Sequence, residues 1–236
     1  MGLDSDAADL LCGALEQTGA RAMLFDADQS PQSEAVGMCQ LVVIHVRPDN
    51  ANCQWLVAEA SVPPGLSIVL LGSPEQLLAL SPQVQTRTAG LLIEGCLSNE
   101  VLLRLRFAIA QPPVSATRGA TSADEVVAYD ETAAHPTIEA AMKEHGLNCR
   151  LAANGPDTIL LLHNVRPRAA VLDVNLDGIE VLAAVRAEAM PVRTVVIASE
   201  NQEEEILRAS SLGAEDYLLQ PFRPLELVAR VKRLVG

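Results

Sequence analysis

The second half of the chain alternates short apolar runs with longer amphipathic segments. Because the runs are continuously apolar and alternate with helical patterns, they predict a parallel sheet with helices on both faces. The predicted strands are 126–129, 149–153, 169–172, 194–198 and 216–219. The predicted helices, recognised by their helical spacing of apolar positions, are 132–145, 156–164, 178–188, 203–211 and 225–234.

These elements together make an α/β domain of the doubly wound kind. For a domain of this size we expect the flavodoxin-like strand order 2-1-3-4-5. Ligands of such sheets bind beyond the carboxyl ends of the strands. Candidate functional residues are therefore those that directly follow a predicted strand.

The first half of the chain repeats the pattern in a degenerate form. At an offset of 128, residues 7–25 align with 135–153 and residues 43–46 with 171–174. Near the end of each half the offset falls to 126, and 91–94 aligns with 217–220. Few residues are identical, but the order and spacing of the elements agree, which predicts an internal duplication.

The duplication predicts that the first domain lacks its first strand. The residue equivalent to Asp130 is Gly2, so no strand fits before the first helix. Three explanations stay open: a trimmed chain, a sheet in which strand 2 closes on strand 3, or a strand supplied by a partner. A stretch rich in Pro, Ser, Thr and Gly separates the halves. We predict a degenerate domain at 1–111, a linker at 112–123 and a second domain at 124–236.

Composition excludes several classes of function. The formal net charge is −13 and Lys and Arg form no basic run, so we expect no nucleic-acid binding. No apolar run reaches the roughly 18 residues of a membrane span, and we expect a cytoplasmic protein. There is no Gly-x-Gly-x-x-Gly motif, P-loop or Gly-x-Ser-x-Gly elbow, so we expect no enzyme.

Two carboxylates stand where strands 1 and 3 of the second domain end. Asp130 follows the first strand and Asp173 the third, and these strands are neighbours in the expected order. Oxygen ligands of this kind suit a hard divalent cation such as Mg²⁺.

The run Gly-Ala-Glu-Asp-Tyr-Leu-Leu-Gln-Pro-Phe at 213–222 resembles the Gly-Ala-x-Asp-Tyr-Leu-x-Lys-Pro-Phe signature of bacterial response-regulator receiver (CheY-like) domains. The resemblance extends over 124–236. It implies a phosphoacceptor at Asp173, with Mg²⁺ held by Asp130, Asp173 and Asn175. It also implies a cis peptide bond at Gln220–Pro221.

The chain departs from this family at the residues that assist the aspartate. Tyr129 stands at the first acidic position of strand 1, Ala198 at the switch Thr/Ser and Gln220 at the lysine. Tyr217 occupies the switch-aromatic position. The loop after Asp173 is also shorter than the family's. A neutral amide makes a weaker contact with a phosphoryl group than a cation does, and we expect Mg²⁺ binding to be weak or absent.

Two hypotheses follow from the resemblance and its departures. One is a tandem pseudo-receiver, a protein-interaction module of two-component signal transduction. The alternative is a functional phosphorelay receiver that accepts a phosphoryl group on Asp173 from a histidine kinase with Mg²⁺. In the first domain His45 stands in place of Asp173 and Glu94 in place of the lysine. We expect His45 to have no partner and this domain to be chemically silent.

The expected partners are signalling proteins, either a histidine kinase or an output protein. A homodimer through helix 4, strand 5 and helix 5 of the second domain is a further expectation, because acidic and basic residues lie on adjacent helices. The acidic residues are Glu203–Glu205, and the basic ones are Arg223, Arg230, Lys232 and Arg233. We expect the output to lie in a partner or in a further part of a longer protein.

Overall fold

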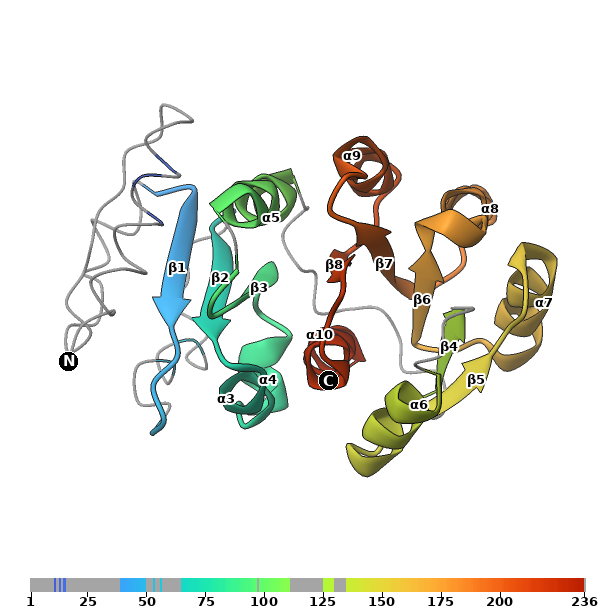
Figure 1. Ribbon diagram of the computed structural model, residues 1–236, viewed down its shortest axis with the longest axis horizontal. Coiled ribbons are helices and arrows are strands. Elements are labelled where there is room, and N and C mark those ends of the chain that lie inside the picture. Colours follow the sequence, from blue (N-terminus) through green and yellow to red (C-terminus); the bar gives the residue numbers. More distant parts are fainter. Residues whose placement is uncertain are drawn as a thin grey trace. The chain divides into compact units, whose positions relative to one another are not determined.

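The chain folds into two compact units, Met1–Val114 and Ser115–Gly236, each with its own parallel sheet (Figure 1). The predicted linker at 112–123 lies outside the described residues. The computed structural model describes residues 11, 13, 15, 39–49, 53, 56, 65–96, 98–110, 125–129 and 135–235.

Five strands form the sheet of the second unit in the order β5-β4-β6-β7-β8, and all neighbours are parallel. Numbered within the unit, this is the predicted order 2-1-3-4-5. All five residues of β6 are buried, which explains why its sequence is almost entirely apolar. The strands are β4 (Glu125–Tyr129), β5 (Asn148–Leu151), β6 (Ala169–Asp173), β7 (Arg193–Ser199) and β8 (Asp216–Gln220).

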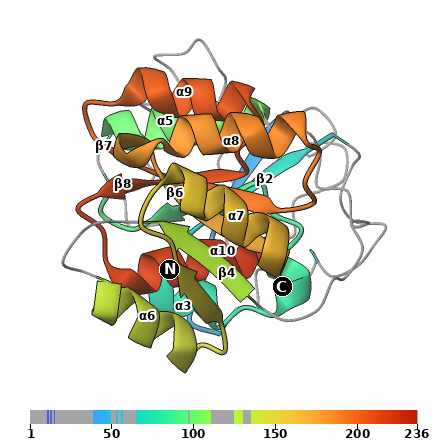
Figure 2. The ribbon, with the colours of Figure 1, turned by 90° about the vertical axis from the view of Figure 1, so that its right-hand side faces the viewer.

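Helices cover both faces of this sheet. The helix α6 packs against α10, and α8 packs against both α7 and α9. Figure 2 shows α8 and α9 on one side of the strands and α6 and α10 on the other. The predicted flavodoxin-like, doubly wound fold is therefore confirmed. The helices are α6 (His135–Glu144), α7 (Gly155–Val165), α8 (Gly178–Ala187), α9 (Glu203–Ser211) and α10 (Pro224–Val235).

Boundaries match the predictions within a few residues. Helix α9 begins and ends at the predicted residues, 203 and 211. The edge strand β5 ends at Leu151, earlier than the predicted 153, and most of its residues are exposed. An edge strand has a neighbour on one side only, so its apolar pattern is a weaker guide to its end.

The sheet of the first unit has three described strands in the order β1-β2-β3, all parallel. Helix α5 packs on β2 and β3, around Leu71, Leu92 and Leu105. The predicted lack of a first strand concerns residues before 39, most of which lie outside the described residues. The elements are β1 (Leu41–His45), β2 (Ser67–Gly72), α3 (Pro74–Leu78), α4 (Pro82–Gln85), β3 (Gly90–Ile93) and α5 (Ser98–Ala110).

The elements of the two units keep constant offsets along the chain. An offset of 128 relates both ends of β1 to those of β6. An offset of 126 relates the first residues of β2, β3 and α5 to those of β7, β8 and α10. The element offsets are the ones that the sequence alignment used, and the internal duplication stays a prediction.

A buried ion-pair cluster joins α10 to the start of β8. Arg230 Nη1 lies 3.3 Å from Asp216 Oδ1, and Arg233 Nη2 lies 3.1 Å from Asp216 Oδ2. Arg230 also contacts Glu226 at 2.7 Å. Burial lowers the pKa of Arg233, and Asp216 opposes that effect. Removing one member of such a cluster leaves an uncompensated buried charge, at a cost of about 3–5 kcal/mol.

This cluster corrects the predicted pairing surface. Arg230 and Arg233 were expected to face a partner, but their side chains are 0% and 3% exposed and both contact Asp216. Helical periodicity places the two arginines on the polar side of α10, and it does not reveal that Asp216 lies opposite them.

Cys53 of the first unit is buried, and burial raises the pKa of its thiol to about 11, which keeps it protonated and unreactive at neutral pH. No helix in the described part of the chain is both long and apolar enough to span a membrane.

Candidate functional site

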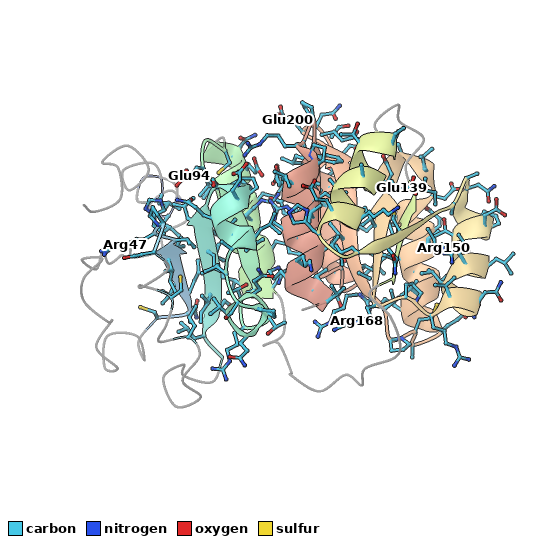
Figure 3. The ribbon with its side chains drawn as sticks, turned by 90° about the horizontal axis from the view of Figure 1, so that it is seen from below. Arg47, Glu94, Glu139, Arg150, Arg168 and Glu200 are labelled. Atoms are coloured by element: carbon cyan, nitrogen blue, oxygen red, sulfur yellow. The ribbon has the colours of Figure 1, made fainter. Side chains whose placement is uncertain are left out.

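The carboxyl ends of β6, β7 and β8 lie side by side at one edge of the second sheet. In the strand register, Asp173 pairs with Ile197 and Ser199 pairs with Gln220. Glu200, the residue after β7, is labelled at this edge in Figure 3. The parallel register therefore brings together residues that are 47 positions apart, such as Asp173 and Gln220.

Asp173 is the last residue of β6 and is only 2% exposed. Its Oδ1 accepts a hydrogen bond from the backbone N–H of Asn175 at 2.8 Å. Its Oδ2 accepts one from Gln220 Nε2 at 3.4 Å, which is long for an N–H···O contact. The carboxylate is thus held firmly by the backbone that follows it and more loosely by the neutral amide across the sheet edge.

The short loop after Asp173 depends on a glycine. A 3₁₀ turn, Val174–Leu176, follows the aspartate directly, and Asp177 then adopts a left-handed conformation with φ of 60°. At Gly178 an added Cβ would overlap the carbonyl oxygen of Asp173. A side chain at Gly178 would therefore push the backbone of the aspartate out of place.

Gln202 connects the ends of β6 and β7. Its Nε2 donates to Asn175 Oδ1 at 2.8 Å, and its Oε1 accepts from the backbone N–H of Ser199 at 2.8 Å. Sequence reasoning selected Asn175 and missed Gln202. The available signal was a glutamine directly before a helix start, where Ser, Thr, Asp and Asn are the usual residues.

Two candidate switch positions are buried apolar or aromatic side chains. Ala198 and Tyr217 are both 0% exposed. Ala198 pairs with Leu219 in the β7–β8 ladder, and its role as the switch position stays a prediction from the resemblance. Alanine has no donor to offer to a ligand at Asp173.

The metal site of the sequence analysis is only partly described. Asp130 lies outside the described residues, and Tyr129 is described by its backbone, which pairs with Leu172. The oxygens of Asp173 and Asn175 are the donor types that Mg²⁺ prefers, but Asn175 Oδ1 already accepts from Gln202. In the described segments, no three His, Cys, Asp or Glu residues come together as a metal site. Mg²⁺ binding by Asp130, Asp173 and Asn175 therefore stays a prediction.

The corresponding edge of the first unit carries a bonded pair. His45 Nε2 lies 2.8 Å from Glu94 Oε1, and the two side chains are 30% and 44% exposed (Figure 3 labels Glu94). The expectation that His45 has no partner was therefore wrong. The two residues are 49 positions apart in the sequence, and no sequence pattern indicates that their side chains meet.

The second unit matches a known family. Residues 126–232 match the model of the response regulator receiver domain. This part of the chain therefore belongs to the response regulator receiver family, as the signature at 213–222 predicted.

Two curated relatives agree with this assignment. Transcriptional regulatory protein PrrA of Mycobacterium tuberculosis (strain ATCC 25618 / H37Rv) is 33% identical over 120 residues, covering 50% of this chain and 52% of PrrA. Response regulator MprA of Mycobacterium sp. (strain KMS) is 32% identical over 113 residues, covering 47% and 49%. The chain spans about half the length of these curated relatives. Chemotaxis protein CheY4 of Vibrio cholerae, a solved structure, is 22% identical with a TM-score of 0.44, covering 48% of this chain and 99% of CheY4.

The close approach at Gly178 generates a prediction about the site. Gly178→Ala should lower the free energy of unfolding by about 3 kcal/mol, because the new methyl group must displace the Asp173 backbone. Gly146→Ala is the matched control. Gly146 has φ of 76° and no neighbour within 4 Å of an added Cβ, so only backbone strain of about 1 kcal/mol applies.

Urea unfolding of the full chain measures the loss of unfolding free energy in both variants. The amide NMR shifts of Asp173 and Asn175 report whether the Asp173 backbone is displaced. We expect those shifts to move in Gly178→Ala only. Equal costs with unchanged shifts would show that Gly178 does not position the aspartate.

Proposed function

We propose that the chain is a tandem pseudo-receiver, which transmits a signal through protein contacts without phosphoryl transfer. The observation that carries this proposal is the environment of Asp173. Across the sheet edge its carboxylate meets the neutral amide of Gln220 at 3.4 Å. The aspartate keeps the position of a phosphoacceptor without the cation and the hydroxyl that the receiver resemblance implies.

The missing groups matter because a phosphoryl group carries nearly two negative charges. A charge-assisted hydrogen bond is roughly twice as strong as a neutral one. With glutamine at position 220 and alanine at position 198, one such bond is reduced to a neutral contact and one donor is lost. Both changes raise the free energy of a phosphorylated Asp173.

The alternative is a functional phosphorelay receiver that accepts a phosphoryl group on Asp173 from a histidine kinase with Mg²⁺. Its support is the position of Asp173 at the carboxyl end of a central strand, within the edge where α/β sheets bind ligands. A metal held by Asp130, Asp173 and Asn175 would neutralise part of the charge. The phosphoryl-transfer experiment below separates the two functions.

The first unit has a related role in the proposal. We assign residues 1–111 to a degenerate receiver-like domain joined by the linker 112–123 to the second domain at 124–236. Where the receiver resemblance has an aspartate and a lysine, this unit has His45 and Glu94, whose Nε2 and Oε1 lie 2.8 Å apart. A unit of this kind contributes contacts and has no phosphoacceptor aspartate at that position.

The partners of the proposal are signalling proteins, either a histidine kinase or an output protein. PrrA is named as a transcriptional regulatory protein, and that description concerns PrrA. For the present chain, with a net charge of −13, the absence of direct nucleic-acid binding stays a prediction.

A second copy of the chain is the further partner that we propose, docking on the face formed by α9, β8 and α10. Helix α9 begins with three glutamates and exposes 40% of Leu207. Lys232 lies near the end of α10. The glutamates of α9 and Lys232 of α10 are opposite in charge, which suits a two-fold interface in which α9 of one copy meets α10 of the other.

Acetyl phosphate with Mg²⁺, followed by intact mass spectrometry of the full chain, tests phosphoryl transfer. We expect no covalent phosphoryl group on the wild-type chain. In the double variant Ala198→Thr, Gln220→Lys, a labelled fraction should become detectable, because one cation and one hydroxyl are restored.

The same double variant with Asp173→Asn is the control and should remain unlabelled. Labelling of the wild-type chain that disappears in Asp173→Asn would contradict the pseudo-receiver proposal and establish the phosphorelay alternative.

Sedimentation velocity tests the proposed dimer. Leu207→Asp should raise the dissociation constant about tenfold or more, since an exposed leucine at an interface is replaced by a charge beside three glutamates. The matched control is Leu160→Asp on α7, where the leucine is 59% exposed on a different helix. A wild-type chain that sediments as a monomer, or equal effects of the two substitutions, would exclude this interface.

A further inference from the structure

The turn Ser199–Gln202, at the end of β7, fixes the side chain of Gln202. The backbone N–H of Gln202 donates to Ser199 O at 3.0 Å, and Ser199 N–H donates in return to Gln202 Oε1 at 2.8 Å. These reciprocal bonds close the turn Ser199–Gln202 on itself. The side chain of Gln202 therefore has a defined position at the carboxyl end of β7.

Gln202 stands at the N-cap of α9 but does not cap it. Its side chain makes no hydrogen bond to the first turn of the helix. Ser73 caps α3 and Asn154 caps α7 through their side chains, whereas Ser81 at α4 and Asp177 at α8, like Gln202, make no side-chain cap. The start of α9 has no side-chain cap, but the negative charges of Glu203–Glu205 in its first turn stabilise the helix.

The amide of Gln202 is used across the site. Its Nε2 donates to Asn175 Oδ1 at 2.8 Å, in the loop that follows Asp173. The backbone N–H of Asn175 in turn donates to Asp173 Oδ1 at 2.8 Å. A continuous chain of hydrogen bonds thus runs from Ser199 through Gln202 and Asn175 to the carboxylate of Asp173.

We propose that Gln202 is a positioning residue that ties the loop after β7 to the loop after β6. Its Oε1 accepts from the Ser199 N–H, and its Nε2 donates to Asn175 Oδ1 in the loop after Asp173. The loops that follow β6 and β7 are thereby held in one arrangement without phosphorylation. This inference rests on the proposed pseudo-receiver function and names the residue that fixes its state.

The reason for a glutamine is that both halves of its amide are needed. An acceptor is required for Ser199 N–H and a donor for Asn175 Oδ1. Glutamate at position 202 keeps the acceptor and loses the donor, and alanine loses both. The two substitutions therefore separate the halves of the interaction.

Amide hydrogen exchange of the full chain, measured by NMR without phosphodonor or Mg²⁺, tests the inference. In Gln202→Ala, exchange of the Ser199 amide should accelerate about five- to tenfold, as expected for the loss of one hydrogen bond. In Gln202→Glu, Ser199 should keep its protection, while the Asn175 side-chain resonances shift. Glu204→Ala, at an exposed position in the first turn of the same helix, is the control and should leave both unchanged.

Unchanged Ser199 exchange in Gln202→Ala would overturn the inference. Equal acceleration in Gln202→Ala and Gln202→Glu would also overturn it, because the side chain would then act by packing and not as an acceptor. These rates do not depend on phosphoryl transfer. Labelling of Asp173 by acetyl phosphate would therefore contradict the proposed function while leaving the Ser199 result to decide the role of Gln202.

Discussion

A buried carboxylate at the end of a buried strand has to be satisfied by polar groups close by, and Asp173 is such a carboxylate. Its Oδ1 accepts from the backbone N–H of Asn175, which lies in the 3₁₀ turn directly after the aspartate. That turn requires glycine at position 178, because a Cβ there would overlap the Asp173 carbonyl oxygen. The bond from Asn175 to Asp173 and the glycine at position 178 therefore go together with the short loop that leads into α8.

The fold of the second unit was predictable because its signals are strong. Continuous apolar strands alternate with amphipathic helices, and this pattern leaves few arrangements other than a doubly wound sheet. The position of Asp173 at the end of a central strand followed from the same pattern. The hydrogen-bond partners of Asp173 could not be predicted from the sequence, because they depend on side-chain directions that periodicity does not specify.

Particular residues illustrate that limit. Arg230 looked like a surface cation, but Asp216 at the start of β8 holds it in a buried cluster. His45 looked isolated, yet Glu94 lies 2.8 Å away across the sheet edge. No sequence motif predicts a role for Gln202, because a glutamine before an acidic helix start is not a recognised pattern. In each case the partner is distant in sequence or belongs to a loop, where pattern carries little information.

Each unit pairs the side chain at the end of one strand with a side chain at the end of the strand two positions along its sheet. In the second, Asp173 at the end of β6 contacts Gln220 at the end of β8. In the first, His45 at the end of β1 contacts Glu94 just after β3. Both pairs bridge strands that have one strand between them. Each site is thus satisfied within its own unit, and this supports a signalling scaffold whose state is fixed by internal contacts.

The most direct test of this account is a crystal structure of the full chain grown with Mg²⁺ and beryllofluoride, a mimic of a phosphoryl group. The account predicts an Asp173 carboxylate without beryllofluoride, still bonded to the Asn175 amide, with Gln202 still on Ser199. Beryllofluoride on Asp173, with Gln202 displaced from the Ser199 amide, would contradict it.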